Sequence, residues 1–462
     1  MTAFDDDPGG PLLVTPAGTT VVWTDALLAS ADRLGALQSA LHLDVARVVA
    51  ADHLGGMSMH GVIPPLEQAR ALCADTADTM RLVAEQYSAA EQVSEEVQRQ
   101  LAAMIATALG EALPFLAAYV ILNPLPLIGL ALGGWLSFPD DGDGRLAALR
   151  DWMLAHPELV TSPEFVRFVS LFATSIDDGA RGAAGIPYWL SPLFSSDDNG
   201  VATGALTIAT LGGAFGMFKE SEVAVTRVSL ETPASAPTGA RDLLDRVPEV
   251  NQVRIETYEA PGMPTRYAVY IGPTETFSPY ATTEPWDMTS NVYGVAGLSP
   301  GSLRAVEDAM ADAGIRSGDE VQVVGFSQGG LIATMVAASP DWNVVSAATY
   351  GAPAGNIALP DGVAGIAVRN TDDFIPALAG PQLDHHLMQI EREAYAGDTP
   401  PPTGIAAPAH QRFSYEATAD AIDAARSEAI RSQLTQLEGF GDGYVENGGS
   451  ITVSTYHAVR VH

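Results

Sequence analysis

Residues 321–333 read VQVVGFSQGGLIA, and this stretch decides the predicted fold. Its first half has the apolar run of a buried strand, and residues 331–338 have the pattern of a helix. Between them, Gly325 to Gly329 matches G-x-S-x-G with Ser327 at the centre. A serine there needs a tight strand-to-helix turn, and the two glycines leave room because a Cβ would crowd the neighbouring strand and helix. We therefore predict a nucleophile elbow at Ser327.

A second match to the same pattern runs from Gly297 to Gly301, with Ser299 at its centre. The residue after a nucleophile must donate its backbone N–H to the developing oxyanion, and Pro300 has no N–H. No buried strand leads into this segment. Ser299 therefore reads as the region before a helix, and we reject it as a nucleophile.

From residue 238 onward the sequence alternates between predicted strands and predicted helices. This alternation is typical of a parallel sheet covered on both faces. We therefore expect an α/β fold, with a catalytic domain over residues 238–462. The expected strands are 251–258, 266–271, 321–326, 344–350, 365–369 and 388–395, and the expected helices are 303–313, 331–338 and 415–437.

The preceding part of the chain is predicted to be mainly α-helical. Residues 1–100 form a helical hairpin region with a Gly- and Pro-rich break at 55–65, and residues 101–138 contain a single charge, Glu111. That apolar stretch is either a membrane-contacting or a buried hairpin. Residues 139–237 are a mixed helical region and linker, and they hold a second uncharged run, 201–218.

Composition excludes some classes of function. The 462 residues carry 23 Lys and Arg against 56 Asp and Glu, a net charge of −33, which repels phosphate backbones and argues against a nucleic-acid partner. The single cysteine, Cys73, allows neither an internal disulfide nor a cysteine-based zinc cluster. The acidic start, MTAFDDDPGG, lacks the basic and apolar regions of a Sec signal.

A nucleophilic serine needs a base that is oriented by a carboxylate, and after an elbow the chain order is Ser, Asp or Glu, then His. Asp373 follows the predicted strand 365–369 and is the preferred acid, with Asp372 as the alternative. His410 follows the last predicted strand of the sheet and is the preferred base, because catalytic groups gather at carboxyl ends of strands. His386 precedes that strand and is the alternative base.

Two backbone N–H groups are expected to bind the oxyanion. The first belongs to Gln328, directly after the nucleophile at a helix N-terminus. The second comes from the turn after strand 266–271, and because Pro273 cannot donate, it belongs to Thr274 or Glu275. Such a site needs no metal and no organic cofactor.

Residues 241–415 resemble α/β-hydrolases of the lipase and esterase kind, of a type found in actinobacteria. The resemblance is carried by the segments Y-I-G-P-T, D-M-T-S-N, V-V-G-F-S-Q-G-G, T-Y-G-A-P, T-D-D-F-I-P and P-A-H. It implies the α/β-hydrolase fold, with Ser327 as nucleophile, Asp373 as acid and His410 as base. The G-F-S-Q-G elbow also resembles that of cutinases, whose histidine spacing would favour His386. Cutinases are disulfide-bonded, however, and this chain has one cysteine.

The N-terminal hairpin region resembles the helical-hairpin substrates of type VII secretion. Tyr87 to Glu91 matches their Y-x-x-x-E signal, although no Trp-x-Gly stands at the turn near Gly55. The resemblance implies the type VII secretion machinery as a partner, and a location at the membrane or cell surface without a Sec signal. A cytoplasmic location is the alternative.

These observations predict a serine hydrolase that cleaves carboxylic esters of an acyl or lipid substrate through an acyl-enzyme. One alternative is an acyltransferase or thioesterase that uses the same three side chains. A second alternative is an exported or membrane-bound interaction protein in which the hydrolase domain is an inactive scaffold.

Overall fold

The computed structural model describes residues 201–461 except 215, 233–234, 381–385 and 398, together with 3–5, 12–15 and most of 150–173. Isolated positions between 38 and 74 are also described, and they are helical. The chain divides into two compact units, one formed by Met1–Thr19 with Tyr119–His462 and the other by Thr20–Ala118. The rest of the predicted hairpin region and the apolar stretch 101–138 lie outside the described residues.

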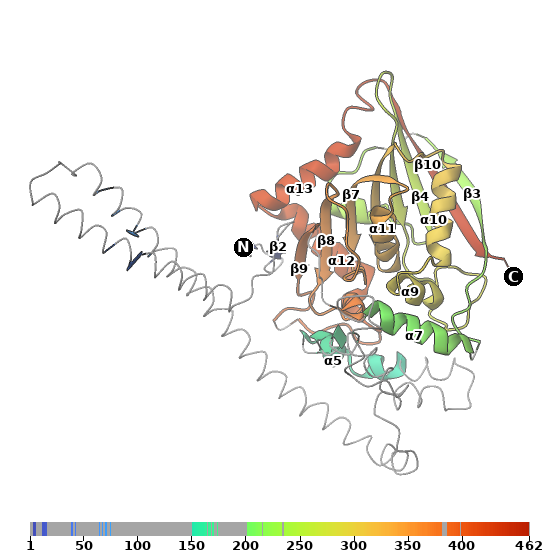
Figure 1. The fold of residues 1–462 in the computed structure, drawn as a ribbon, viewed down its shortest axis with the longest axis horizontal. Helices are drawn as coiled ribbons and strands as arrows, with labels where there is room; N and C mark the ends of the chain where they lie inside the picture. The colour runs from blue at the N-terminus through green and yellow to red at the C-terminus, as the bar shows by residue number, and fades with distance from the viewer. Residues whose placement is uncertain are drawn as a thin grey trace, which may run out of the picture. The chain divides into compact units, whose positions relative to one another are not determined.

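A mixed sheet lies at the centre of the first unit (Figure 1), so the chain has the predicted α/β character. Its strand order is β1-β2-β9-β8-β7-β6-β5-β4-β10-β3. Strands β5 to β9 are neighbours in chain order and run parallel, whereas the strands on either side pair antiparallel. The strands are β1 Ala3–Asp5, β2 Leu12–Thr15, β3 Val223–Glu231, β4 Val253–Glu259, β5 Arg266–Ile271, β6 Glu320–Phe326, β7 Asn343–Tyr350, β8 Ala364–Asn370, β9 Met388–Arg392 and β10 Ser450–Arg460.

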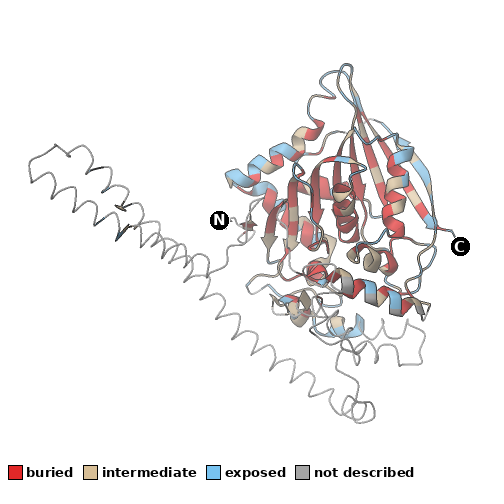
Figure 2. Ribbon diagram, viewed as in Figure 1, coloured by how far each residue is buried: buried red, intermediate tan, exposed pale blue. Residues whose placement is uncertain are grey.

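Helices cover both faces of this sheet, and each face has its own hydrophobic core (Figure 2). Side chains alternate along β6, so that Val324 and Phe326 pack with α8, α12 and α13, whereas Val321 and Val323 pack with α10 and α11. Burial on both faces explains why the parallel strands read as continuous apolar runs. The helices are α5 Pro157–Val160, α7 Val201–Ala214, α8 Ala240–Asp245, α9 Met288–Val295, α10 Gly301–Asp312, α11 Gln328–Ala338, α12 Arg412–Ala424 and α13 Glu428–Glu438, with 3-10 turns η2 Pro376–Ala379, η3 Pro408–His410 and η4 Gly439–Gly441.

Residues 201–214 of the uncharged run 201–218 form helix α7, which packs against α9 (Figure 1). The segment around α5 contacts the loop after β8, where Phe165 packs edge-on against Phe374 with ring centroids 5.5 Å apart. Within the part of the chain that the structure describes, no helix has the length and apolar character needed to cross a membrane.

Three features of the fold differ from the sequence predictions. The long final helix expected over 415–437 is two helices, because Ala425 has an extended backbone (ψ 140) between α12 and α13. The C-terminal tail forms β10, the strand that pairs with both β4 and β3. Strands β1 and β2 lie within the region 1–100 predicted as a helical hairpin, and β3 lies within the region predicted as mixed helix and linker, so the sheet includes strands from before residue 238.

Candidate active site

Ser327 occupies the predicted turn between β6 and α11. Its backbone has φ 54 and ψ −121, a conformation that L-residues avoid unless the surroundings impose it. The Ser327 N–H donates to the Tyr350 carbonyl at the end of β7 (2.8 Å), and the Ser327 carbonyl accepts the N–H groups of Gly330 (2.9 Å) and Leu331 (3.2 Å) in α11. Added Cβ atoms would overlap the Gly329 carbonyl at Gly325 and the Ile271 carbonyl at Gly329. The glycines therefore allow the helix to contact β5 and β6 closely.

The structure brings Ser327, His410 and Asp373 together in one hydrogen-bonded chain. His410 Nε2 lies 2.7 Å from Ser327 Oγ, and His410 Nδ1 lies 2.5 Å from Asp373 Oδ2. The three side chains come from the β6–α11 turn, from η3 after β9, and from the loop after β8. All three positions follow parallel strands, so the residues meet at the carboxyl edge of the sheet.

Packing fixes the orientation of the His410 ring. It stacks on Phe326 at 5.4 Å between centroids and meets Tyr415 edge-on at 6.1 Å. When Nδ1–H donates to Asp373, Nε2 remains an acceptor for the Ser327 hydroxyl. This is the tautomer that a general base needs.

Asp373 is 1 % exposed, so protein hydrogen-bond donors must replace the water that a carboxylate would otherwise bind. Oδ1 accepts the Ile375 N–H at 2.9 Å, and Oδ2 accepts the Tyr415 hydroxyl at 2.7 Å as well as the contact from His410. Burial is the largest cause that raises the pKa of Tyr415 well above its ordinary value, and the negative charge of Asp373 is the second. The phenol therefore stays protonated and can donate. Sequence reasoning did not single out Tyr415.

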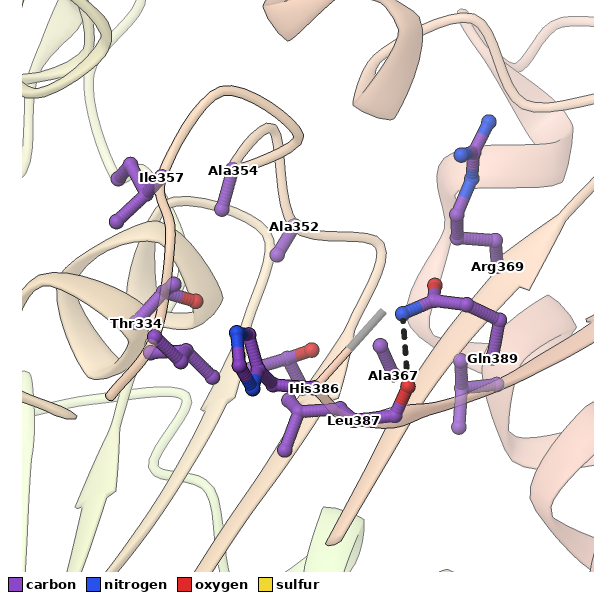
Figure 3. A pocket seen from close by; sticks show the side chains of 12 residues that line it. Thr334, Ala352, Ala354, Ile357, Ala367, Arg369, His386, Leu387 and Gln389 are labelled. Atoms are coloured by element: carbon purple, nitrogen blue, oxygen red, sulfur yellow. Dashed lines mark hydrogen bonds between the residues drawn. The ribbon is translucent and has the colours of Figure 1, made fainter. Parts of the chain in front are cut away.

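The two alternative residues lie outside this relay. The Asp372 carboxylate accepts the N–H groups of Ala394 (2.9 Å) and Tyr395 (3.0 Å), and burial raises its pKa to about 6. His386 Nδ1 lies 3.9 Å from Asp361 Oδ1. The His386 side chain lines a separate pocket together with Gln389 (Figure 3). Asp372 therefore anchors the loop after β9, and neither residue contacts Ser327.

The two segments predicted to bind an oxyanion adjoin each other. The Gln328 N–H is the first of α11, where helix geometry provides no intrahelical acceptor. The Glu275 N–H donates to the Trp286 carbonyl at 2.8 Å, which leaves the Thr274 N–H as the candidate second donor. Thr274 is itself held by Asn291, whose Nδ2 donates to Thr274 Oγ1 at 2.9 Å. Because α11 contacts the end of β5 at Gly329, both donors lie on touching segments.

A buried ion-pair network lies behind this oxyanion region. Arg460, at the end of β10, contacts Asp287 Oδ1 at 3.0 Å and Glu220 Oε2 at 2.6 Å, and its side chain is fully buried. Asp287 caps the N-terminus of α9, and its carbonyl accepts Gln328 Nε2 at 2.9 Å. The network therefore connects the last strand to Gln328, the residue after Ser327.

Among the residues that the structure describes, no three His, Cys, Asp or Glu side chains gather closely enough to hold a metal ion. Comparisons with known proteins found no match: no family model fits the sequence, and no curated protein and no solved structure matches it.

Proposed function

We propose that this chain is a serine hydrolase with the α/β-hydrolase fold, and that it cleaves carboxylic esters. The hydrogen-bonded chain from Ser327 through His410 to Asp373 carries the proposal. The order of these residues along the chain, and the strand–turn–helix around Ser327, are those of a nucleophile elbow with its base and acid. Geometry of this kind activates a hydroxyl that is otherwise a weak nucleophile.

The proposed reaction has two halves. His410 Nε2 takes the hydroxyl proton as Ser327 Oγ bonds to the ester carbonyl carbon, while Asp373 stabilises the imidazolium. The carbonyl oxygen becomes an oxyanion that accepts the N–H groups of Gln328 and Thr274. His410 then protonates the departing alcohol and leaves an acyl-Ser327 ester. A water molecule, deprotonated by His410, releases the acid and restores the hydroxyl.

Apolar side chains that follow site residues in sequence support an acyl substrate. Phe374 follows Asp373 directly, and Leu378 in η2 is 43 % exposed. Phe277, in the loop after the Thr274 turn, is 60 % exposed. Exposed apolar side chains that follow site residues in sequence suit a hydrocarbon chain better than a charged group. Contact with a membrane and export by the type VII machinery depend on segments outside the described residues, and they stay predictions.

A fluorophosphonate probe tests the nucleophile. We expect labelling of the full-length protein, loss of labelling in Ser327→Ala, and unchanged labelling in the matched control Ser299→Ala, whose exposed serine has the same G-x-S-x-G pattern. Hydrolysis of p-nitrophenyl esters of increasing chain length should be lost in the same variant. Labelling that survives Ser327→Ala would overturn the proposal, and a folded wild type that neither labels nor hydrolyses would favour the inactive scaffold.

A further inference from the structure

Tyr415 contacts the proposed relay from the side opposite Ser327. It lies in the first turn of α12, is fully buried, and donates its hydroxyl to Asp373 Oδ2 at 2.7 Å. The same carboxylate oxygen is in contact with His410 Nδ1. The phenol oxygen also accepts the Asn370 N–H at 3.3 Å, which fixes its direction at the end of β8.

The surroundings of Tyr415 are shaped to hold it there. A Cβ at Gly351 would lie 2.9 Å from the phenol oxygen, and Gly351 has a φ of +60, so only glycine suits this position. Asn370 and Thr418 continue the contact: the Asn370 amide donates to the Ala409 carbonyl beside His410 (2.8 Å) and accepts the Thr418 hydroxyl (2.8 Å). Helix α12 therefore supports both Asp373 and the backbone next to His410.

We propose that Tyr415 is a positioning residue of the hydrolase site, and that its hydroxyl holds Asp373 in place and limits how strongly Asp373 attracts a proton to His410. This inference rests on the proposed function. A carboxylate that accepts three donors shares its charge among them, so that less of it acts on the imidazolium. Without the phenol proton, the remaining charge acts mainly on His410, and the Asp373–His410 pair retains its proton to higher pH.

Three ionisable groups of the described residues bear on this pair. Asp372, next to Asp373 in sequence, has a pKa raised to about 6 by burial, but its carboxylate accepts the Ala394 and Tyr395 N–H groups and is unchanged in a Tyr415 variant. Arg369 on β8 acts on Tyr415 through its charge, and the Tyr395 hydroxyl lies 3.0 Å from Ser414 Oγ in the first turn of α12. Burial raises the pKa of Tyr395, so its phenol is neutral where a histidine titrates. Loss of the Tyr415 hydroxyl therefore changes the donor set of Asp373 without removing a charge.

The test is Tyr415→Phe in the full-length protein, which keeps the ring and removes one oxygen. We expect kcat/KM for a p-nitrophenyl ester at neutral pH to fall by roughly tenfold, and the acidic limb of its pH profile to move to higher pH by about half a unit to one unit. The matched control is Tyr444→Phe, another buried tyrosine whose hydroxyl donates to a backbone carbonyl, that of Pro264 (2.6 Å). Its profile should equal that of the wild type.

A second measurement separates this inference from the proposed function. The titration midpoint of the His410 imidazole, followed by NMR of histidine-labelled protein and assigned with His410→Gln, needs no substrate. A higher midpoint in Tyr415→Phe supports the role of Tyr415 even if the wild type hydrolyses no ester, which would refute only the proposed reaction. A midpoint and a pH profile that both match the wild type would overturn the inference, whatever the activity.

Discussion

Replacing Arg460 by methionine should destabilise the sheet far more than removing a surface arginine. Arg460 is fully buried, and its guanidinium contacts Asp287 and Glu220. Glu220 keeps two other donors, the Arg304 guanidinium (2.8 Å) and the Gly301 N–H (3.1 Å). Asp287 keeps only the Ser290 N–H (2.9 Å) and loses its ion-pair partner, so the variant mainly affects the charge of Asp287.

The expected loss of stability follows from the buried Asp287 carboxylate that has lost its ion-pair partner. Breaking a buried ion pair from one side costs about 3–5 kcal/mol, because the partner charge stays desolvated. Asp287 is 0 % exposed, and its Oδ2 already has no hydrogen-bond partner. Burial raises the pKa of Asp287 even with Arg460 present, and the variant should raise that pKa further. We expect the free energy of unfolding at pH 7 to fall by about 3–5 kcal/mol.

The sign of the pH dependence gives an independent check. A carboxyl whose pKa is higher in the folded than in the unfolded state binds its proton more tightly when folded, so the free energy of unfolding falls as pH rises through that window. The difference in free energy of unfolding between wild type and Arg460→Met should therefore be smaller at pH 5 than at pH 7. Adding Asp287→Asn removes the charge and should recover about half of the loss at pH 7.

Urea unfolding of the full-length protein, followed by near-ultraviolet circular dichroism at both pH values, measures these quantities. The control is Arg227→Met on β3, because the Arg227–Asp312 pair is 36 % and 55 % exposed and should contribute at most about 1 kcal/mol. The reasoning is refuted if Arg460→Met loses no more stability than Arg227→Met. It is also refuted if the loss is the same at both pH values and Asp287→Asn does not relieve it.

Three further predictions concern the neighbouring groups. Asp373→Asn should lower kcat on a p-nitrophenyl ester by about 10⁴-fold through the wrong histidine tautomer, whereas Asp372→Asn should lower it less than about tenfold; equal losses would contradict the assignment of the acid. Because burial raises the pKa of Asp372 to about 6, the folded state holds that proton more tightly. The free energy of unfolding of the wild type, relative to Asp372→Asn in urea titrations, should therefore fall by about 2 kcal/mol as pH rises from 4 to 7, and a constant difference would exclude this effect. Gly329→Ala should yield little folded protein in a solubility and circular dichroism assay, because its Cβ would overlap the Ile271 carbonyl, whereas Gly318→Ala, with open space around its Cβ, should fold normally.

The parallel part of the sheet could be predicted because its signals are local. Strand β5 has the bounds expected from sequence, and β6 and β7 each begin one residue earlier than predicted. Once the strands are parallel, residues that follow their ends must gather at one edge, so chain order alone sufficed to rank His410 above His386. The close approach of Ser327 and Asp373 to His410 follows from that geometry and needed no knowledge of side-chain packing.

The contacts behind the site could not be predicted, because they join segments far apart in sequence. Tyr415 reads as an ordinary core aromatic on a helix, and only the position of β8 places its hydroxyl on Asp373. In the sequence, Arg460 is a single charge near the C-terminus. Its burial depends on β10, which pairs with strands about 200 residues earlier along the chain, and no local pattern indicates that pairing. Yet Arg460 braces Asp287, whose carbonyl holds the Gln328 side chain. Local sequence patterns thus predict that Ser327, His410 and Asp373 lie together, whereas the final strand supports the helix and turn proposed to bind the oxyanion.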